Sequence, residues 1–201
     1  MTHTDTTPPR PEASRAVAMA RPAARPWPLL GGLMLATGLG AGLISAAAAQ
    51  DTPQVDGHEI AFVAADGAEI GTATLTGTPV GLLIELDLHD LPPETWHGFH
   101  IHETGECDPE DGFRSAGGHF SVSDTEHGFL VPGGPHSGDM PNQYVAADGT
   151  LKAQVFTPYA FFGDAADNVS GRALVLHGGP DDYESQPSGA AGDRIACAVI
   201  E

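Results

Sequence analysis

The stretch Val80-Gly81-Leu82-Leu83-Ile84-Glu85-Leu86-Asp87-Leu88 indicates the fold class of this chain more clearly than any other. Aliphatic side chains occupy every second position from Val80 to Leu88 and alternate with a mostly polar set. A period of two residues with one polar face is typical of a strand that is buried on one side. No stretch after residue 50 shows a convincing period of 3.6 residues, so we expect an all-β protein.

Short runs of the same kind lie on both sides of this strand and are separated by turn residues. Asp66-Gly67 and Asp148-Gly149 are hairpin turn signals. The other expected strands are 59–63, 69–75, 98–102, 144–146, 151–156, 172–176 and 196–200. Together with 80–88 they predict an eight-stranded antiparallel Greek-key β-barrel or sandwich. Two long loops, 103–142 and 178–193, interrupt the strands, and loops of this length in a compact domain are usually functional or disordered.

The first 49 residues have the pattern of a secretory signal segment. Four arginines precede an uncharged apolar stretch, 29–46, which is followed by Ala47-Ala48-Ala49. This order predicts cleavage after Ala49 and a periplasmic or secreted location. The alternative is an uncleaved anchor, because the apolar stretch is nearly long enough to span a bilayer. We therefore expect a signal segment, 1–49, and one functional domain, 50–201.

The charge of the chain excludes one class of partner. The sequence has 8 basic and 27 acidic residues, a formal net charge of −19. Removal of 1–49 takes away four arginines, Asp5 and Glu12, which leaves 4 basic and 25 acidic residues and a net charge of −21. Nucleic-acid binding needs a basic patch, so we expect no nucleic-acid partner. We expect contact with a membrane only through the signal segment, if it stays uncleaved.

Export also bears on the two cysteines. Cys107 and Cys197 are an even pair in a chain that is expected to enter an oxidising compartment, which predicts a disulfide. The bond would close a loop of about 90 residues and, on the chain-entropy model, contribute roughly 4 kcal/mol to stability.

Several histidines are spaced like metal ligands. His100 and His102 lie at positions i and i+2 of the expected strand 98–102, so both imidazoles project from one face and Phe99 and Ile101 from the other. In an antiparallel barrel, His177 at the end of the strand 172–176 can meet this pair. Three or four imidazoles around one ion suit a redox metal such as copper.

The first long loop carries a second set of donors. Within 21 residues it places His119, His127, His136 and Asp139 among glycines and prolines. A loop has no sheet ladder to hold it, and a bound metal would give it a fixed shape. Three imidazoles and one carboxylate suit tetrahedral zinc.

Four segments, in this order along the chain, resemble the copper–zinc superoxide dismutases. They are 97–102 (His-Gly-Phe-His-Ile-His), 115–120 (Ser-Ala-Gly-Gly-His-Phe), 134–139 (Gly-Pro-His-Ser-Gly-Asp) and 192–197 (Gly-Asp-Arg-Ile-Ala-Cys). The similarity covers roughly residues 56–201, and the short second loop is similar to that of the exported bacterial branch. The fold of this family, an eight-stranded Greek-key barrel, agrees with the eight expected strands.

The resemblance implies one copper and one zinc per chain and a role for each donor. The implied copper ligands are His100, His102, His119 and His177, and the implied zinc ligands are His119, His127, His136 and Asp139. His119 would bridge the two metals, and Asp181 would hydrogen-bond one ligand of each. Arg194 would receive the anion beside copper, and Cys107 would pair with Cys197.

The implied reaction is disproportionation of two superoxide anions to O₂ and H₂O₂, with copper alternately reduced and reoxidised and with His119 and Arg194 as catalytic residues. Two departures stand out. Ser121-Val122 replaces the usual Asn-Pro, which removes no ligand, and the second loop has no lysine, so the basic guidance residues of many relatives are missing.

Two other functions compete with this interpretation. A copper-binding module without turnover would keep the ligands but show no superoxide activity. A structural zinc domain would leave His100, His102 and His177 unexplained together. A superoxide assay and metal analysis distinguish the three. The oligomeric state stays open between monomer and homodimer, because the family uses different dimer surfaces.

Overall fold

A computed structural model describes residues 57–201, and the predicted signal segment lies outside the described residues. The described residues form eight strands: β1 (His58–Ala64), β2 (Glu69–Thr78), β3 (Gly81–Leu88), β4 (Trp96–His102), β5 (Asp139–Tyr144), β6 (Leu151–Thr157), β7 (Arg172–His177) and β8 (Arg194–Ile200). Two short 3₁₀ turns, η1 (Pro109–Asp111) and η2 (Arg114–Ala116), lie in the first long loop. Within the described part, no helix has the length and apolar character needed to cross a membrane. The all-β prediction is confirmed.

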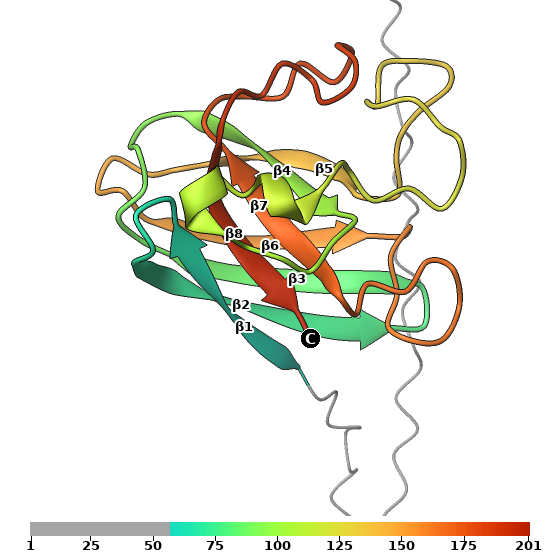
Figure 1. The fold of residues 1–201 in the computed structure, drawn as a ribbon, viewed down its shortest axis with the longest axis horizontal. Coiled ribbons are helices and arrows are strands. Elements are labelled where there is room, and N and C mark those ends of the chain that lie inside the picture. The colour runs from blue at the N-terminus through green and yellow to red at the C-terminus, as the bar shows by residue number, and fades with distance from the viewer. Residues whose placement is uncertain (1–56) are drawn as a thin grey trace, which may run out of the picture. The chain divides into compact units, whose positions relative to one another are not determined.

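All strand pairs are antiparallel, in the order β5-β4-β7-β8-β1-β2-β3-β6 (Figure 1). The chain passes from β3 to β4 and from β6 to β7 without pairing them, which is the Greek-key connectivity that was predicted. The end strands β5 and β6 approach each other without a shared hydrogen-bond ladder. The sheet is therefore a nearly closed barrel.

The alternating strand β3 shows why the barrel has a core. In β3, Leu82, Ile84 and Leu88 are fully buried, whereas Glu85 and Asp87 are exposed. The apolar set faces inward with the corresponding residues of the neighbouring strands, and the polar set faces solvent. Phe99 and Ile101 of β4 belong to the same core, as the alternation of that strand predicted.

The prediction of a strand at 144–146 was wrong, because β5 ends where that strand was expected to begin. The sequence of β5 contains Pro141, and a proline normally argues against a strand. However, β5 is an edge strand, and edge strands tolerate proline. In β5, Met140 pairs with Phe99 and Asp139 with His100. This register places the loop's carboxylate beside the first of the two predicted histidine ligands on β4.

Backbone hydrogen bonds fasten the first long loop to β4. Phe120 N–H donates to the carbonyl of Ile101 at 2.8 Å, and Ile101 N–H donates to the carbonyl of Gly138 at 2.9 Å. A further bond joins Gly138 N–H to the carbonyl of Phe120 at 2.8 Å. The residues next to these anchors, His119 and Asp139, are thereby held against β4.

Candidate metal centre

The seven residues predicted as metal ligands come together in two overlapping groups. One group is His100, His102, His119 and His177, and the other is His119, His127, His136 and Asp139. Within each group, one nitrogen or oxygen atom of every member lies within 4.8 Å of those of the others. His119 belongs to both groups, so the two candidate sites are adjacent and share one side chain.

The first group, which we call the four-histidine site, is built mainly on strands. His100 and His102 are on β4, and His177 is the last residue of the neighbouring strand β7. His119 comes from the loop, but its backbone forms an isolated β-bridge with His102. The sheet ladder therefore fixes the spacing of three of these rings directly and that of the fourth through the bridge.

Each of the three strand-borne rings uses one nitrogen in a hydrogen bond. Nε2 of His100 faces Asp181 Oδ2 at 2.8 Å, and Nδ1 of His102 faces the Gly117 carbonyl at 3.0 Å. Nδ1 of His177 faces the Gly192 carbonyl at 3.3 Å. A carbonyl or carboxylate oxygen only accepts, so each of these nitrogens carries the hydrogen. The opposite nitrogen of each neutral ring then presents a lone pair.

Those opposite nitrogens are buried and unpaired. Nδ1 of His100 and Nε2 of His102, His119 and His177 have no hydrogen-bond partner among the described residues. Burial lowers the pKa of all four rings, to about 4 for His119 and about 3 for His177. Leaving buried polar atoms unpaired is costly, about 1–3 kcal/mol each. Four convergent lone pairs on neutral rings fit a metal ion such as copper, which accepts imidazole donors.

The second group, which we call the mixed site, is centred on one carboxylate oxygen. Asp139 Oδ1 lies 2.8 Å from His119 Nδ1, 3.0 Å from His127 Nδ1 and 3.4 Å from His136 Nδ1. The other oxygen, Oδ2, accepts the N–H groups of Gly128 and His136, both at 2.9 Å. Although burial acts to raise the pKa of Asp139, the hydrogen bonds from His119 and His127 hold it well below its usual range. Three nitrogens around one fixed oxygen fit tetrahedral zinc.

The Asp181 carboxylate contacts both groups of candidate ligands. Its Oδ2 meets His100 Nε2 at 2.8 Å and its Oδ1 meets His127 Nε2 at 3.0 Å, so it contacts one ring of each site. Burial acts to lower the pKa of His127, but the Asp139 and Asp181 carboxylates on its two nitrogens raise it to about 9. Gly189 covers this contact with φ +65°, and a Cβ there would collide with Asp181 Oδ1.

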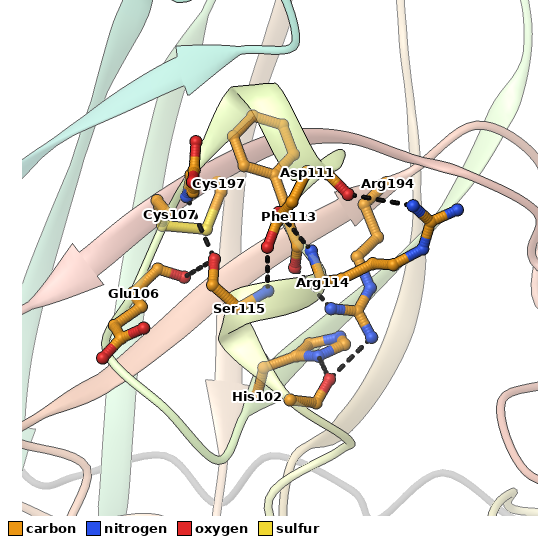
Figure 2. The surroundings of a disulfide bond; sticks show 11 residues. His102, Glu106, Cys107, Asp111, Phe113, Arg114, Ser115, Arg194 and Cys197 are labelled. Atoms are coloured by element: carbon orange, nitrogen blue, oxygen red, sulfur yellow. Dashed lines mark hydrogen bonds between the residues drawn. A yellow bond between two sulfur atoms is a disulfide. The ribbon is translucent and has the colours of Figure 1, made fainter.

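A cavity of about 420 Å³ leads to the four-histidine site. Its lining includes His102, His119, His177, Pro187, Ser188 and Arg194. The Arg194 guanidinium donates from Nη1 to the Phe113 carbonyl and from Nη2 to the Gly117 carbonyl at 2.6 Å. The Gly117 oxygen also accepts from His102, so the cation and the ring share one anchor (Figure 2).

The predicted disulfide between Cys107 and Cys197 is confirmed. Cys197 lies on β8 three residues after Arg194, and Cys107 begins the part of the loop that supplies the carbonyls of Phe113 and Gly117 (Figure 2). The bond thus ties the strand that carries the guanidinium to the segment that orients it.

Sequence reasoning missed three anchors of the site. The Gly117 carbonyl carries no side-chain signal at all. Asn142 and Gln186 each bond the backbone of a residue far away in sequence, Asp181 and His127 respectively. No spacing pattern in the chain pointed to either amide.

Comparisons with known proteins agree with this geometry. The family model described as copper/zinc superoxide dismutase matches residues 69–200. A copper–zinc superoxide dismutase of Aquifex aeolicus is 48% identical over 139 residues, which cover 67% of this chain and 82% of the relative.

Solved structures give the same result. The copper–zinc superoxide dismutase of Brucella abortus superposes with a TM-score of 0.61 at 32% identity and covers 73% of this chain and all of that one. A superoxide dismutase-like protein of Bacillus subtilis superposes with a TM-score of 0.69 at 36% identity, covering 72% of this chain and 99% of its own. A family model that matches most of the described residues, relatives of this identity and a barrel of the same architecture lead to one conclusion: the chain belongs to the copper/zinc superoxide dismutase family.

Proposed function

We propose that this protein is a copper–zinc superoxide dismutase that holds one copper in the four-histidine site and one zinc in the mixed site. The observation that carries the proposal is the set of four buried, unpaired imidazole nitrogens that converge beside a three-nitrogen, one-oxygen group and share His119 with it. The reaction converts two superoxide anions and two protons into O₂ and H₂O₂. Copper, when bound, supplies the one-electron exchange with each anion.

Arg194 supplies the attraction for the anion. Its guanidinium lines the cavity together with rings of the four-histidine site, and two carbonyl oxygens fix its orientation. Of the other basic residues of the described chain, Lys152 bonds Asp87 and Arg172 bonds the Glu103 carbonyl. Arg114 bonds the Asp111 carbonyl and lines a second cavity together with Arg194. In this acidic protein, the positive field of the cavity depends heavily on Arg194.

His119 supplies a position for a proton. Its Nδ1 faces the mixed site and its Nε2 faces the four-histidine site. When Nδ1 is engaged by the mixed site, Nε2 is the one nitrogen of the ring that can still accept a proton. The His119 ring also lines the cavity. His119 can therefore hold one of the two protons on Nε2 when that nitrogen is not bound to copper.

Export completes the proposal. We infer that residues 1–49 are removed after Ala49 and that the remaining domain works in the periplasm or outside the cell, which agrees with the disulfide. N-terminal sequencing of the exported protein should give Gln50 as the first residue. A first residue within 1–46 would contradict cleavage.

Metal analysis and a superoxide assay test the function itself. The purified protein, supplied with both ions, should bind about one copper and one zinc, and pulse radiolysis should show rapid decay of superoxide. His177→Ala should lose copper and activity but keep zinc, because His177 belongs to the four-histidine site alone. Binding of both metals without turnover would favour the copper-binding module, and zinc without copper would favour the structural zinc domain.

A further inference from the structure

Two side-chain amides hold the second long loop against the metal centre. The Gln186 side chain accepts from His127 N–H at 2.9 Å through Oε1 and donates to the His127 carbonyl at 2.8 Å through Nε2. The Asn142 side chain does the same with the N–H and carbonyl of Asp181, both at 2.8 Å. Each amide satisfies both backbone groups of its partner, as a neighbouring strand would do.

The two loops approach each other closely around these amides. Gly128 has φ +106°, and a Cβ there would collide with the Tyr183 carbonyl. The same carbonyl accepts the N–H of Leu130 at 3.1 Å. Tyr183 also accepts the N–H of Asn142 at 2.8 Å through its hydroxyl. The segment 181–186 therefore packs directly on the backbone of 127–130.

Gln186 differs from Asn142 in its neighbours along the chain. The next two residues, Pro187 and Ser188, form part of the wall of the cavity that leads to the four-histidine site. The Gln186 side chain thus hydrogen-bonds the backbone of His127, a mixed-site residue, and is next in sequence to the wall of this cavity. We call it the anion cavity. No other described side chain makes a two-point contact of this kind with the backbone of His127.

We propose that Gln186 is a positioning residue that makes occupation of the mixed site order the wall of the anion cavity. The inference rests on the proposed function, because it takes zinc as the ion of the mixed site. Zinc bound to His127 Nδ1 would restrict the motion of that residue, and the two hydrogen bonds to its backbone would pass this restriction to Gln186. Ordering 127 first reduces the entropy cost of ordering 185–189, which couples the two without a change of fold.

Matched glutamine variants test the proposal. Gln186→Ala removes both hydrogen bonds to His127 and a third, from Nε2 to the Glu184 carbonyl at 3.1 Å, whereas Gln186→Glu keeps the acceptor and loses the two donor contacts. Gln154→Ala is the control, because Gln154 is on β6, its amide bonds Glu85 on the exposed face of the barrel, and it contacts neither loop. Copper-loaded protein is compared with and without added zinc, by hydrogen exchange of 183–190 and by azide titration of the copper absorption.

In the unsubstituted protein and in Gln154→Ala, zinc should slow exchange in 183–190 and tighten azide binding, each by at least about fivefold. In Gln186→Ala, zinc should still bind at the same stoichiometry while both effects fall below about twofold. Gln186→Glu should lie between them. Zinc effects of equal size in Gln186→Ala would overturn the proposal, and so would loss of zinc uptake, which would make Gln186 a part of the zinc site itself.

The unsubstituted protein separates this test from that of the function. If it binds no zinc, or if azide does not perturb its copper absorption, the proposed function fails before any variant is compared. If it binds both metals but zinc leaves the exchange of 183–190 unchanged, only the role of Gln186 is wrong.

Discussion

The two halves of the metal centre are held in different ways. The four-histidine site takes three of its rings from strands, and burial keeps these rings neutral, so their lone pairs are available at pH 7. The mixed site takes His127 and His136 from a loop and depends on carboxylates, hydrogen bonds from the second loop and the charged His127 ring. The sheet thus fixes the positions of three rings in one half, whereas the other half is held by contacts among its own side chains and with the second loop.

Replacement of His119, the ring that both sites share, should have the largest effect, because it damages both halves at once. His119→Ala deletes a donor from both sites, so we expect both metal affinities to fall at least ~100-fold, more than loss of an outer contact typically costs. Metal analysis after dialysis and a superoxide assay measure this. Full retention of either metal would contradict the bridging role of His119.

Loss of Asp181 should affect the two halves unequally. Asp181→Ala leaves every proposed ligand in place but removes the hydrogen bonds to His100 and His127, and we expect zinc affinity to fall about 10–100-fold. Copper should be lost less readily, because the sheet still holds His100. Competition with a chelator measures both affinities, with Asp148→Ala in an exposed turn as the control. Unchanged zinc affinity would remove Asp181 from the site.

The cavity mouth allows a test of charge near the four-histidine site. Arg194→Glu should lower the second-order rate with superoxide more than about tenfold, equivalent to roughly 1.4 kcal/mol of barrier, and Arg194→Lys should lower it much less. Lys152→Glu makes the same change in net charge on the exposed face of β6 and should have little effect, since the Debye length is only about 8 Å at physiological salt. Stopped-flow on copper-replete protein measures these rates, and a change below twofold in Arg194→Glu would mean that the metal alone captures the anion.

The smallest expected difference between the two sites is in the number of protons released when each binds its metal. In the metal-free protein the pKa of His127 is raised to about 9, so at pH 7 its ring is charged and zinc must displace a proton from Nδ1. The pKa values of His119 and His177 are lowered to about 4 and about 3, so copper meets neutral rings. Zinc affinity should therefore rise between pH 7 and 9, and copper affinity should not.

Calorimetric titration in two buffers of different ionisation enthalpy measures this release. We expect about one more proton for zinc added alone than for copper added alone. Equal release by the two metals would show that the His127 ring is neutral before zinc arrives.

Most of the barrel could be predicted from the sequence because strand alternation is local. β3 was recognisable from its own residues, and His100 and His102 from their positions on one strand. The strand containing Pro141 could not be recognised, since its pairing depends on its place at the edge of the sheet. The site residues were identified by family resemblance and by donor chemistry. The Gly117 carbonyl and the Gln186 amide act through contacts with residues distant in sequence, and such contacts leave no mark on spacing.

The disulfide has a consequence for how the chain would respond to proteolysis. Cys107 and Cys197 close a covalent ring that contains the first long loop from residue 107, the whole second loop and all the proposed ligands except His100 and His102. A single cut anywhere inside this ring opens it but releases no fragment. A molecule cut once would therefore keep all its proposed metal ligands in one covalently connected chain. The two long loops can thus be extensive without a single cleavage separating the ligands.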